Sequence, residues 1–331
     1  MNITVLGAGA WGTALAISLS ANHRVTLWAR DRTQIEEMRA TRCNLRYLPD
    51  IPITDSIKLS ADFFAALRET ELIIIATPTS ALREILQQLA SAKQNFSVVW
   101  VCKGFEAKTS LLPHQVAAEV LPGELCRGVL SGPSFAQEVA RGLPTALTFA
   151  SPDADWAHGI AKKLHHAHLR IYASNDVVGV EVGGAVKNVM AIAAGICDGA
   201  GLGHNARAAL LTRGLAEITR LGLNLGGRPE TLGGLSGAGD LILTCTGDMS
   251  RNRKVGLLLA QQHELPEILH QLGHVAEGVY TVREVHSLAL RLGVAMPICE
   301  AVYRIIYDHI PVADAITELL NRAPNMEFQP S

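Results

Sequence analysis

A glycine-rich motif, GAGAWG over residues 7–12, constrains the fold of this chain more than any other feature. It directly follows an apolar run typical of a strand, residues 3–6, and directly precedes a helical pattern. In this context Gly7 allows a tight turn, Gly9 lets the backbone approach a pyrophosphate, and Gly12 lets the helix pack close to the strand. The pyrophosphate would lie at the helix N-terminus, where unpaired N–H groups favour an anion. The motif therefore predicts a dinucleotide-binding site, and its context disfavours the alternative of a purely structural turn.

The residue that follows the second expected strand bears on the choice of dinucleotide. This strand, residues 24–28, is followed by Ala29 and Arg30. Domains that prefer NAD usually carry an acidic side chain near this position, where it binds the ribose hydroxyls. Arg30 can instead pair with the 2′-phosphate of NADP, although Asp31 follows it directly and a solvated arginine is the alternative. We expect NADPH to be preferred and NADH to be the second choice.

Short apolar runs alternate with helical patterns through the first half of the chain. Near-continuous apolar strands that are separated by helices are typical of a parallel sheet covered on both faces. We expect helices over residues 11–21, 31–41 and 79–91. We expect strands over residues 3–6, 24–28, 72–76, 97–102, 128–130, 146–150 and 169–172.

From about residue 175 the chain becomes rich in Ala, Leu and Gly, and its pattern becomes helical throughout. Because 331 residues exceed what one hydrophobic core usually organises, we expect two domains. The predicted fold is α/β, with a Rossmann-type NAD(P)-binding domain over 1–175, an all-helical substrate and dimerisation domain over 176–322, and a flexible tail over 323–331. The expected helices of the second domain are 176–199, 205–223, 252–263, 275–292, 297–308 and 312–321.

Charge and composition exclude several classes of protein. With 29 basic and 31 acidic residues, the chain has neither a basic field for nucleic acid nor a polybasic membrane patch. Its long apolar stretch over 177–203 contains Glu181, Lys187 and Asp198, which argues against a membrane-spanning helix. The strand expected at the start leaves no room for a signal peptide, and the six cysteines are scattered. We therefore expect a reduced, cytoplasmic protein.

Two lysines are candidates for the chemistry. Lys103 follows the strand 97–102, at the carboxyl edge where parallel sheets bind ligands, although an ordinary surface lysine is the alternative. Lys187 lies in an almost wholly apolar helical stretch, 183–192, where a buried ammonium needs a charged partner, a ligand or water. Burial would also lower its pKa towards neutrality, unless the side chain extends to the surface. Lys187 is therefore the preferred proton donor for the reduction of a carbonyl by hydride.

Polar residues at two expected helix starts complete the candidate site. Asp240 follows a glycine-rich segment and could either cap a helix or orient Lys187. The segment SRNR over 250–253 offers hydroxyl, guanidinium and amide donors, which suit a substrate phosphate or an ordinary polar helix start. His165, His166 and His168 lack a partner cluster at ligand spacing, so we expect no metal.

Eight characteristic segments occur in order along nearly the whole chain, and several are long. They are GAGAWGTALA (7–16), CKGFE (102–106), SGPSFAQE (131–138), GGAVKNVMAI (183–192), GHNARAALLTRG (203–214), GAGDLILTC (237–245), SRNR (250–253) and VAEG (275–278). Together they resemble the bacterial NAD(P)-dependent sn-glycerol-3-phosphate dehydrogenase family.

The resemblance implies a function and a set of site residues. It implies a homodimer that reversibly reduces dihydroxyacetone phosphate to sn-glycerol 3-phosphate for phospholipid synthesis. Lys187 would donate and accept the proton, and Lys103 and Asp240 would assist. The implied substrate contacts are Lys103, Gly132, Ser134, Lys187, Asn188, Asp240, Ser250, Arg251 and Asn252. The implied cofactor contacts are Gly7, Gly9, Ala10, Trp11, Gly12, Arg30, Lys103, Ala136, Arg251, Val275 and Glu277.

Two alternatives remain open at this point. A 6-phosphogluconate or 2-hydroxyacid type dehydrogenase would share the glycine loop, but not the GGAVKNV and SRNR segments together. A non-catalytic NADPH-binding sensor would keep the fold and lose the chemistry. The joint presence of Lys103, Lys187, Asp240 and Arg251 argues against the sensor.

Overall fold

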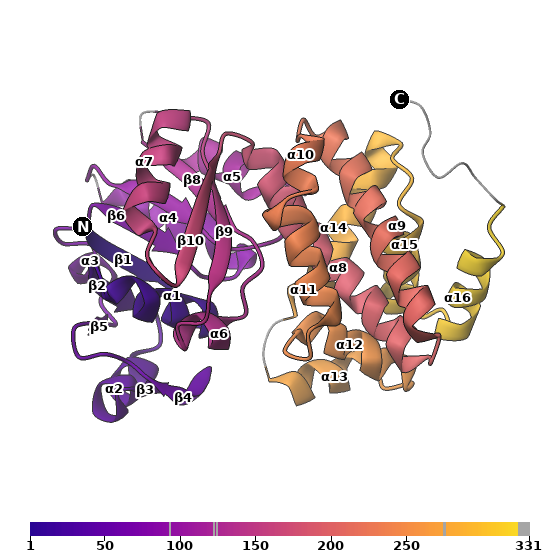
Figure 1. The fold of residues 1–331 in the computed structure, drawn as a ribbon. Helices are drawn as coiled ribbons and strands as arrows, with labels where there is room; N and C mark the ends of the chain where they lie inside the picture. The colour runs from indigo at the N-terminus through magenta and orange to yellow at the C-terminus, as the bar shows by residue number, and fades with distance from the viewer. Residues whose placement is uncertain (93, 122, 124, 274–275, 324–331) are drawn as a thin grey trace.

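The computed structural model describes residues 1–92, 94–121, 123, 125–273 and 276–323. An α/β domain comes first in the chain and an all-helical domain follows it, side by side with the first (Figure 1). The expected fold class is confirmed. The expected tail over 323–331 lies, apart from Ala323, outside the described residues.

An eight-stranded sheet forms the centre of the first domain, in the order β10-β9-β8-β7-β6-β1-β2-β5. Neighbouring strands are parallel except β8 and β9, which are antiparallel. The strand order reverses direction at β1, which has β2 on one side and β6 on the other, and ligands bind beyond such points. The strands are β1 (Asn2–Leu6), β2 (Arg24–Trp28), β5 (Lys58–Ser60), β6 (Leu72–Ile75), β7 (Ser97–Trp100), β8 (Arg127–Ser131), β9 (Thr145–Ala150) and β10 (Leu169–Ser174).

Helices cover both faces of this sheet because successive side chains of each strand point to opposite sides. Ile3 and Val5 of β1 belong to the core under one set of helices, whereas Leu6 belongs to the core under the other. The first set is α1 (Ala10–Ser20), α2 (Arg32–Thr41) and α7 (Ala154–Leu164). The second set is α3 (Phe63–Ala66), α4 (Leu82–Ser91) and α5 (Pro113–Val120). The remaining elements are the hairpin β3 (Cys43–Asn44) and β4 (Leu48–Pro52), the 3-10 turn η1 (Thr79–Ala81) and α6 (Ala136–Ala140).

The helical domain is built around α8, which is buried along almost its whole length (Figure 1). Of the described helices, α8 alone is long and apolar enough to cross a membrane, but 94% of its most apolar window is buried inside the protein. Its apolar character is thus explained by its place in the core. The elements are α8 (Val177–Gly199), α9 (Gly203–Asn224), α10 (Pro229–Leu232), the π-helical turn η2 (Leu235–Gly239), α11 (Asp240–Thr246), α12 (Arg251–Ala260), α13 (Leu265–Leu272), α14 (Glu277–Leu292), α15 (Pro297–Tyr307) and α16 (Val312–Leu320).

All seven strands expected from the sequence are present, and the structure adds β3, β4 and β5. The prediction of one helix over 252–263 was wrong at its end. The helix α12 stops at Ala260, because Gln262 adopts a left-handed backbone conformation with a φ of 66°. The separate helix α13 follows after this turn.

Candidate active site

The glycine loop joins the carboxyl end of β1 to α1. Gly7 has a φ of 120°, and a Cβ atom there would lie 2.8 Å from backbone atoms of Ala76. A Cβ atom on Gly12 would lie 1.9 Å from the carbonyl oxygen of Gly7. At Gly9, which precedes the first turn of α1, a Cβ atom would meet nothing within 4 Å. The loop is therefore closed to side chains inside and open at the helix N-terminus, which fits a pyrophosphate.

Arg30 and Asp31 have different surroundings at the end of β2. The Asp31 carboxylate caps α2 by accepting N–H bonds from Thr33 at 3.0 Å and Gln34 at 3.2 Å. Arg30 is exposed. Because the carboxylate already serves as a helix cap, Arg30 is the better candidate for contact with the adenosine ribose.

Other expected cofactor residues flank the glycine loop. Ala10, Trp11 and Ala136 are partly buried and pack against one small apolar cluster, which consists of Ala14, Leu48, Ile51 and Val139. Glu277 is the first residue of α14, and Val275 lies outside the described residues. Burial raises the pKa of the Glu277 carboxyl, and this effect is opposed by an N–H bond from Thr79 and by the charges of Arg251, Lys103 and Lys187. Glu277 therefore lies close to the exit of β6 and to the candidate substrate residues.

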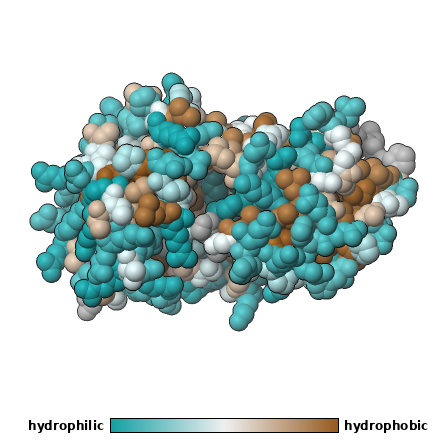
Figure 2. Space-filling model, turned by 90° about the horizontal axis from the view of Figure 1, so that it is seen from below, coloured by the Kyte–Doolittle hydropathy of each residue, from teal (hydrophilic) through white to brown (hydrophobic). Residues whose placement is uncertain are grey.

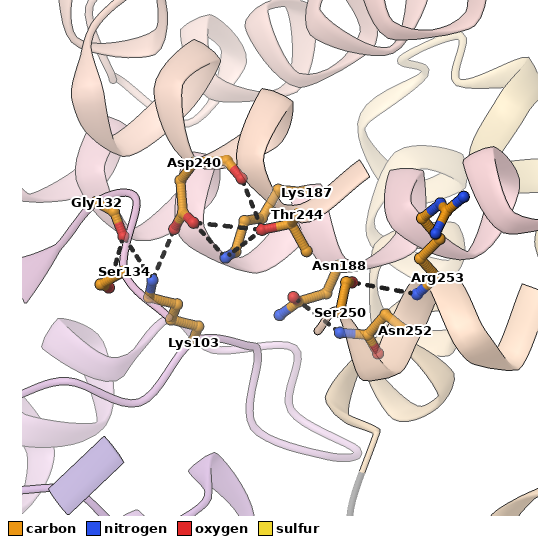
Figure 3. Close-up of polar contacts among 10 residues, drawn as sticks. All are labelled: Lys103, Gly132, Ser134, Lys187, Asn188, Asp240, Thr244, Ser250, Asn252 and Arg253. Carbon is orange, nitrogen blue, oxygen red and sulfur yellow. Dashed lines mark hydrogen bonds and ion pairs between the residues drawn. The ribbon is translucent and has the colours of Figure 1, made fainter. Parts of the chain in front are cut away.

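The two candidate lysines share one carboxylate, that of Asp240 (Figure 3). Lys103 approaches from the first domain, with its Nζ 2.6 Å from Oδ2 of Asp240. Lys187 approaches from α8, with its Nζ 2.5 Å from Oδ1. The Asp240 side chain is 1% exposed and that of Lys187 is 8% exposed. Asp240 therefore contacts both lysines, each through one of its carboxylate oxygens.

The charge balance of this group favours a negative ligand. Two ammonium groups and one carboxylate give one net positive charge in a largely buried place. Burial lowers the pKa of Lys187 to about 8; Asp240 opposes this shift and Lys103 adds to it. Lys187 can thus exchange a proton near neutral pH, and an oxygen that gains negative charge would be stabilised beside it.

Backbone and hydroxyl groups complete the surroundings of the lysines (Figure 3). The carbonyl oxygen of Gly132 accepts from Lys103 Nζ at 3.2 Å and from the Ser134 hydroxyl at 2.9 Å. Lys187 donates to Thr244 Oγ1 at 2.8 Å. Sequence reasoning missed Thr244, although it lies four residues after Asp240 on α11, the spacing at which helical side chains are neighbours.

The SRNR segment forms the start of α12 beside this cluster. Ser250 is the N-cap residue, and its hydroxyl accepts from the backbone N–H of Arg253 at 3.2 Å. Asn252 donates to Oδ1 of Asn188 at 3.0 Å and accepts the N–H of Gly278 at 3.0 Å. Arg251 is exposed at the first helical position. The segment therefore presents a hydroxyl, a guanidinium and helix N–H groups next to α8, and the Asn252 amide joins it to the start of α14.

The expected site residues therefore form two adjoining groups. The first consists of the lysines with their shared aspartate and the Gly132 loop, and the second consists of Asn188 with the start of α12. The surface is hollowed where the two domains meet (Figure 2). Within the described parts of the chain, no cluster of His, Cys, Asp or Glu is suited to a metal ion, and His166 instead lies 3.0 Å from the Ser18 hydroxyl.

Comparison with known proteins shows which family the chain is similar to. The family model for the N-terminus of NAD-dependent glycerol-3-phosphate dehydrogenase matches residues 2–157, and the model for the C-terminus matches residues 176–317. The chain is 59% identical to glycerol-3-phosphate dehydrogenase [NAD(P)+] of Nitrosomonas eutropha over 99% of both chains. It is also 59% identical to that of Thiobacillus denitrificans, over 99% of this chain and 100% of the relative. The crystal structure of glycerol-3-phosphate dehydrogenase from Coxiella burnetii superposes with a TM-score of 0.93 at 41% identity, covering 97% of this chain and 99% of that one.

Proposed function

Because the chain belongs to the NAD-dependent glycerol-3-phosphate dehydrogenase family, we propose that its Lys103–Asp240–Lys187 cluster carries out the chemistry of that enzyme. The protein is an NAD(P)-dependent oxidoreductase. Its reaction is the reversible reduction of dihydroxyacetone phosphate to sn-glycerol 3-phosphate, which supplies phospholipid synthesis. The observation that carries the assignment of residues is the single buried carboxylate that two lysines from different domains share.

Reduction of the ketone requires one hydride at carbon and one proton at oxygen. The glycine loop, Trp11, Arg30, Ala136 and Glu277 would hold NAD(P)H, which would supply the hydride. Lys187, with its lowered pKa, donates its proton to the substrate oxygen as negative charge develops there. Lys103 keeps a second positive charge beside that oxygen, and Asp240 holds both ammonium groups in place. In the reverse direction, neutral Lys187 accepts the proton of the hydroxyl.

The phosphate of the substrate binds at the start of α12. Ser250, Arg251 and Asn252 provide hydroxyl, guanidinium and backbone donors there, and the helix N-terminus favours an anion. Asn188, one residue after Lys187, lies next to Asn252. The carbonyl end of the substrate would then lie at the lysines, where Gly132 and Ser134 approach from the first domain.

Turnover with a matched pair of ketones tests this function. The purified protein should oxidise NADPH rapidly with dihydroxyacetone phosphate and negligibly with unphosphorylated dihydroxyacetone, because the phosphate site is empty in the latter case. The loss of NADPH absorbance measures the rate. Binding of NADPH without turnover across a panel of phosphorylated ketones would favour the non-catalytic sensor.

We propose that Arg30 makes the enzyme prefer NADPH, and Arg30→Asp tests this. The guanidinium is exposed at the end of β2, while the Asp31 carboxylate caps α2. The substitution removes a charge-assisted bond to the 2′-phosphate and adds repulsion, so kcat/KM for NADPH should fall about 10- to 100-fold. The value for NADH should change by only a few fold. Equal losses with both cofactors would show that Arg30 does not discriminate between them.

We also propose that the enzyme is a cytoplasmic homodimer with domains over residues 1–175 and 176–322. Exposed apolar side chains on the helical domain support association, among them Leu290 at 71% and Leu320 at 75% exposure. Brown patches are visible on this domain in Figure 2.

A further inference from the structure

A second buried carboxylate, Glu181, lies in the second turn of α8, six residues before Lys187. Its side chain is 1% exposed. Oε1 accepts the indole N–H of Trp100 at 2.7 Å and the backbone N–H of His114 at 2.9 Å, and Oε2 lies 2.5 Å from His114 Nδ1. A buried carboxylate is costly unless it is hydrogen-bonded, and here all the bonds cross from the first domain to α8.

One partner of Glu181, Trp100, lies on the strand that leads to the active site, and the other, His114, lies in α5. Trp100 is the last residue of β7, is 1% exposed, and comes three residues before Lys103. One turn after Glu181, a Cβ atom on Gly184 would lie 2.9 Å from Oγ of Ser131 and 3.5 Å from the stem of Lys103. The first half of α8 therefore packs directly along the carboxyl ends of β7 and β8. Within this contact, Glu181 provides a hydrogen bond from α8 to Trp100 of β7.

We propose that Glu181 is a positioning residue, which fixes the axial register of α8 against β7 and thereby places Lys187 opposite Lys103 on Asp240. The inference rests on the function proposed above for that cluster. A helix rises about 1.5 Å per residue, so a shift of α8 along its axis by one such step, without rotation, would move Lys187 by about that distance. A misplacement of about 1 Å at a reacting group lowers the rate about 10²-fold. Glu181 does this without contacting substrate or cofactor.

Paired substitutions separate positioning from stability. Glu181→Leu alone leaves the Trp100 N–H buried without a partner, which destabilises the fold. The double variant Glu181→Leu/Trp100→Phe removes the carboxylate together with the indole N–H, so that donor is no longer buried without a partner and part of the stability should be recovered. The His114 side chain is 28% exposed, so its ring can bind water instead. Glu181→Gln is the conservative variant, because its amide oxygen still accepts from Trp100 and its amide N–H can donate to His114.

The double variant should fold and should have a kcat at least about 10-fold below wild type, with KM for dihydroxyacetone phosphate and Kd for NADPH within about threefold. Glu181→Gln should restore kcat to within about threefold of wild type. The control is Glu217→Leu, since Glu217 is also 1% exposed but bonds to the backbone N–H groups of Ile298 and Cys299, away from the sheet. It should lower Tm and leave kcat unchanged.

Three outcomes would overturn the inference. A double variant with the kcat of wild type would show that Glu181 only stabilises the fold. A Glu217→Leu variant with an equal loss of kcat, measured well below its Tm, would show that any destabilisation slows the enzyme. Wild-type enzyme that turns over no dihydroxyacetone phosphate would overturn the proposed function itself and this inference with it, and is distinguished from the other outcomes by the parallel wild-type assay.

Discussion

Lys187→Met should lower kcat for reduction about 10²- to 10⁴-fold and leave Kd for NADPH near that of wild type, because it removes the proposed general acid from the site. Methionine fills much of the same buried volume without a charge, and Asp240 keeps Lys103 as a partner. Stopped-flow and steady-state rates with dihydroxyacetone phosphate measure the loss, and fluorescence titration measures NADPH binding. A kcat close to that of wild type would exclude Lys187 as the proton donor.

The same role predicts the pH dependence of the wild-type enzyme. Burial lowers the pKa of Lys187 to about 8, and reduction needs its ammonium form. The kcat/KM for reduction should therefore fall as the pH rises through about 8, whereas the kcat/KM for oxidation of sn-glycerol 3-phosphate should rise over the same interval, since that direction needs the neutral amine. In Lys187→Met, the residual rate should lose this dependence.

Asp240→Asn should have the second-largest effect, because it removes the one carboxylate between two ammonium groups. Asp240 raises the pKa of Lys187, so its loss should move the basic limb of the reduction profile below pH 8. Because Asp240 no longer holds the two ammonium groups in place, kcat at neutral pH should fall about 10²-fold. Breaking a buried ion pair on one side also destabilises a protein by about 3–5 kcal/mol, which denaturant unfolding measures.

Asp248→Asn provides the matched control. Asp248 also pairs with a cation, Arg253, but its side chain is 96% exposed. Asp248→Asn should leave kcat, the pH profile and the free energy of unfolding nearly unchanged, since exposed ion pairs contribute about 0–1 kcal/mol to stability. If Asp240→Asn kept the basic limb of wild type, the shared carboxylate would not set the proton affinity of Lys187.

The sequence predicted those parts of the fold and site that have a local pattern. The glycine loop, the alternating strands and the lysine in an apolar helix each follow from neighbouring residues. The closeness of Lys103 and Lys187 in space does not follow from neighbouring residues. The two lysines meet at Asp240, which lies 137 residues after Lys103 and 53 residues after Lys187 in the sequence. The break at Gln262 was missed because its left-handed conformation occurs at a non-glycine residue that carries no such signal.

The antiparallel pairing of β8 with β9 also could not be predicted from local sequence patterns. Apolar strands have the same pattern whichever way they run, and the connection here contains only the short helix α6. The strand β4 was missed because its sequence, LPDIP, contains two prolines and lacks clear alternation. Thr244 could have been found, since it occupies the next turn of the helix that Asp240 begins.

The shared carboxylate has a consequence for how this enzyme can diverge. Lys103 comes from the nucleotide-binding half and Asp240 from the helical half, so the proposed machinery for proton transfer is complete only where the two halves pack together. Each half could retain its own ligand and the pair would still be inert if the two halves were misaligned. The turnover rate therefore depends on the contact surface between the two domains. Substitutions at that surface can change kcat while the affinities for cofactor and substrate stay the same.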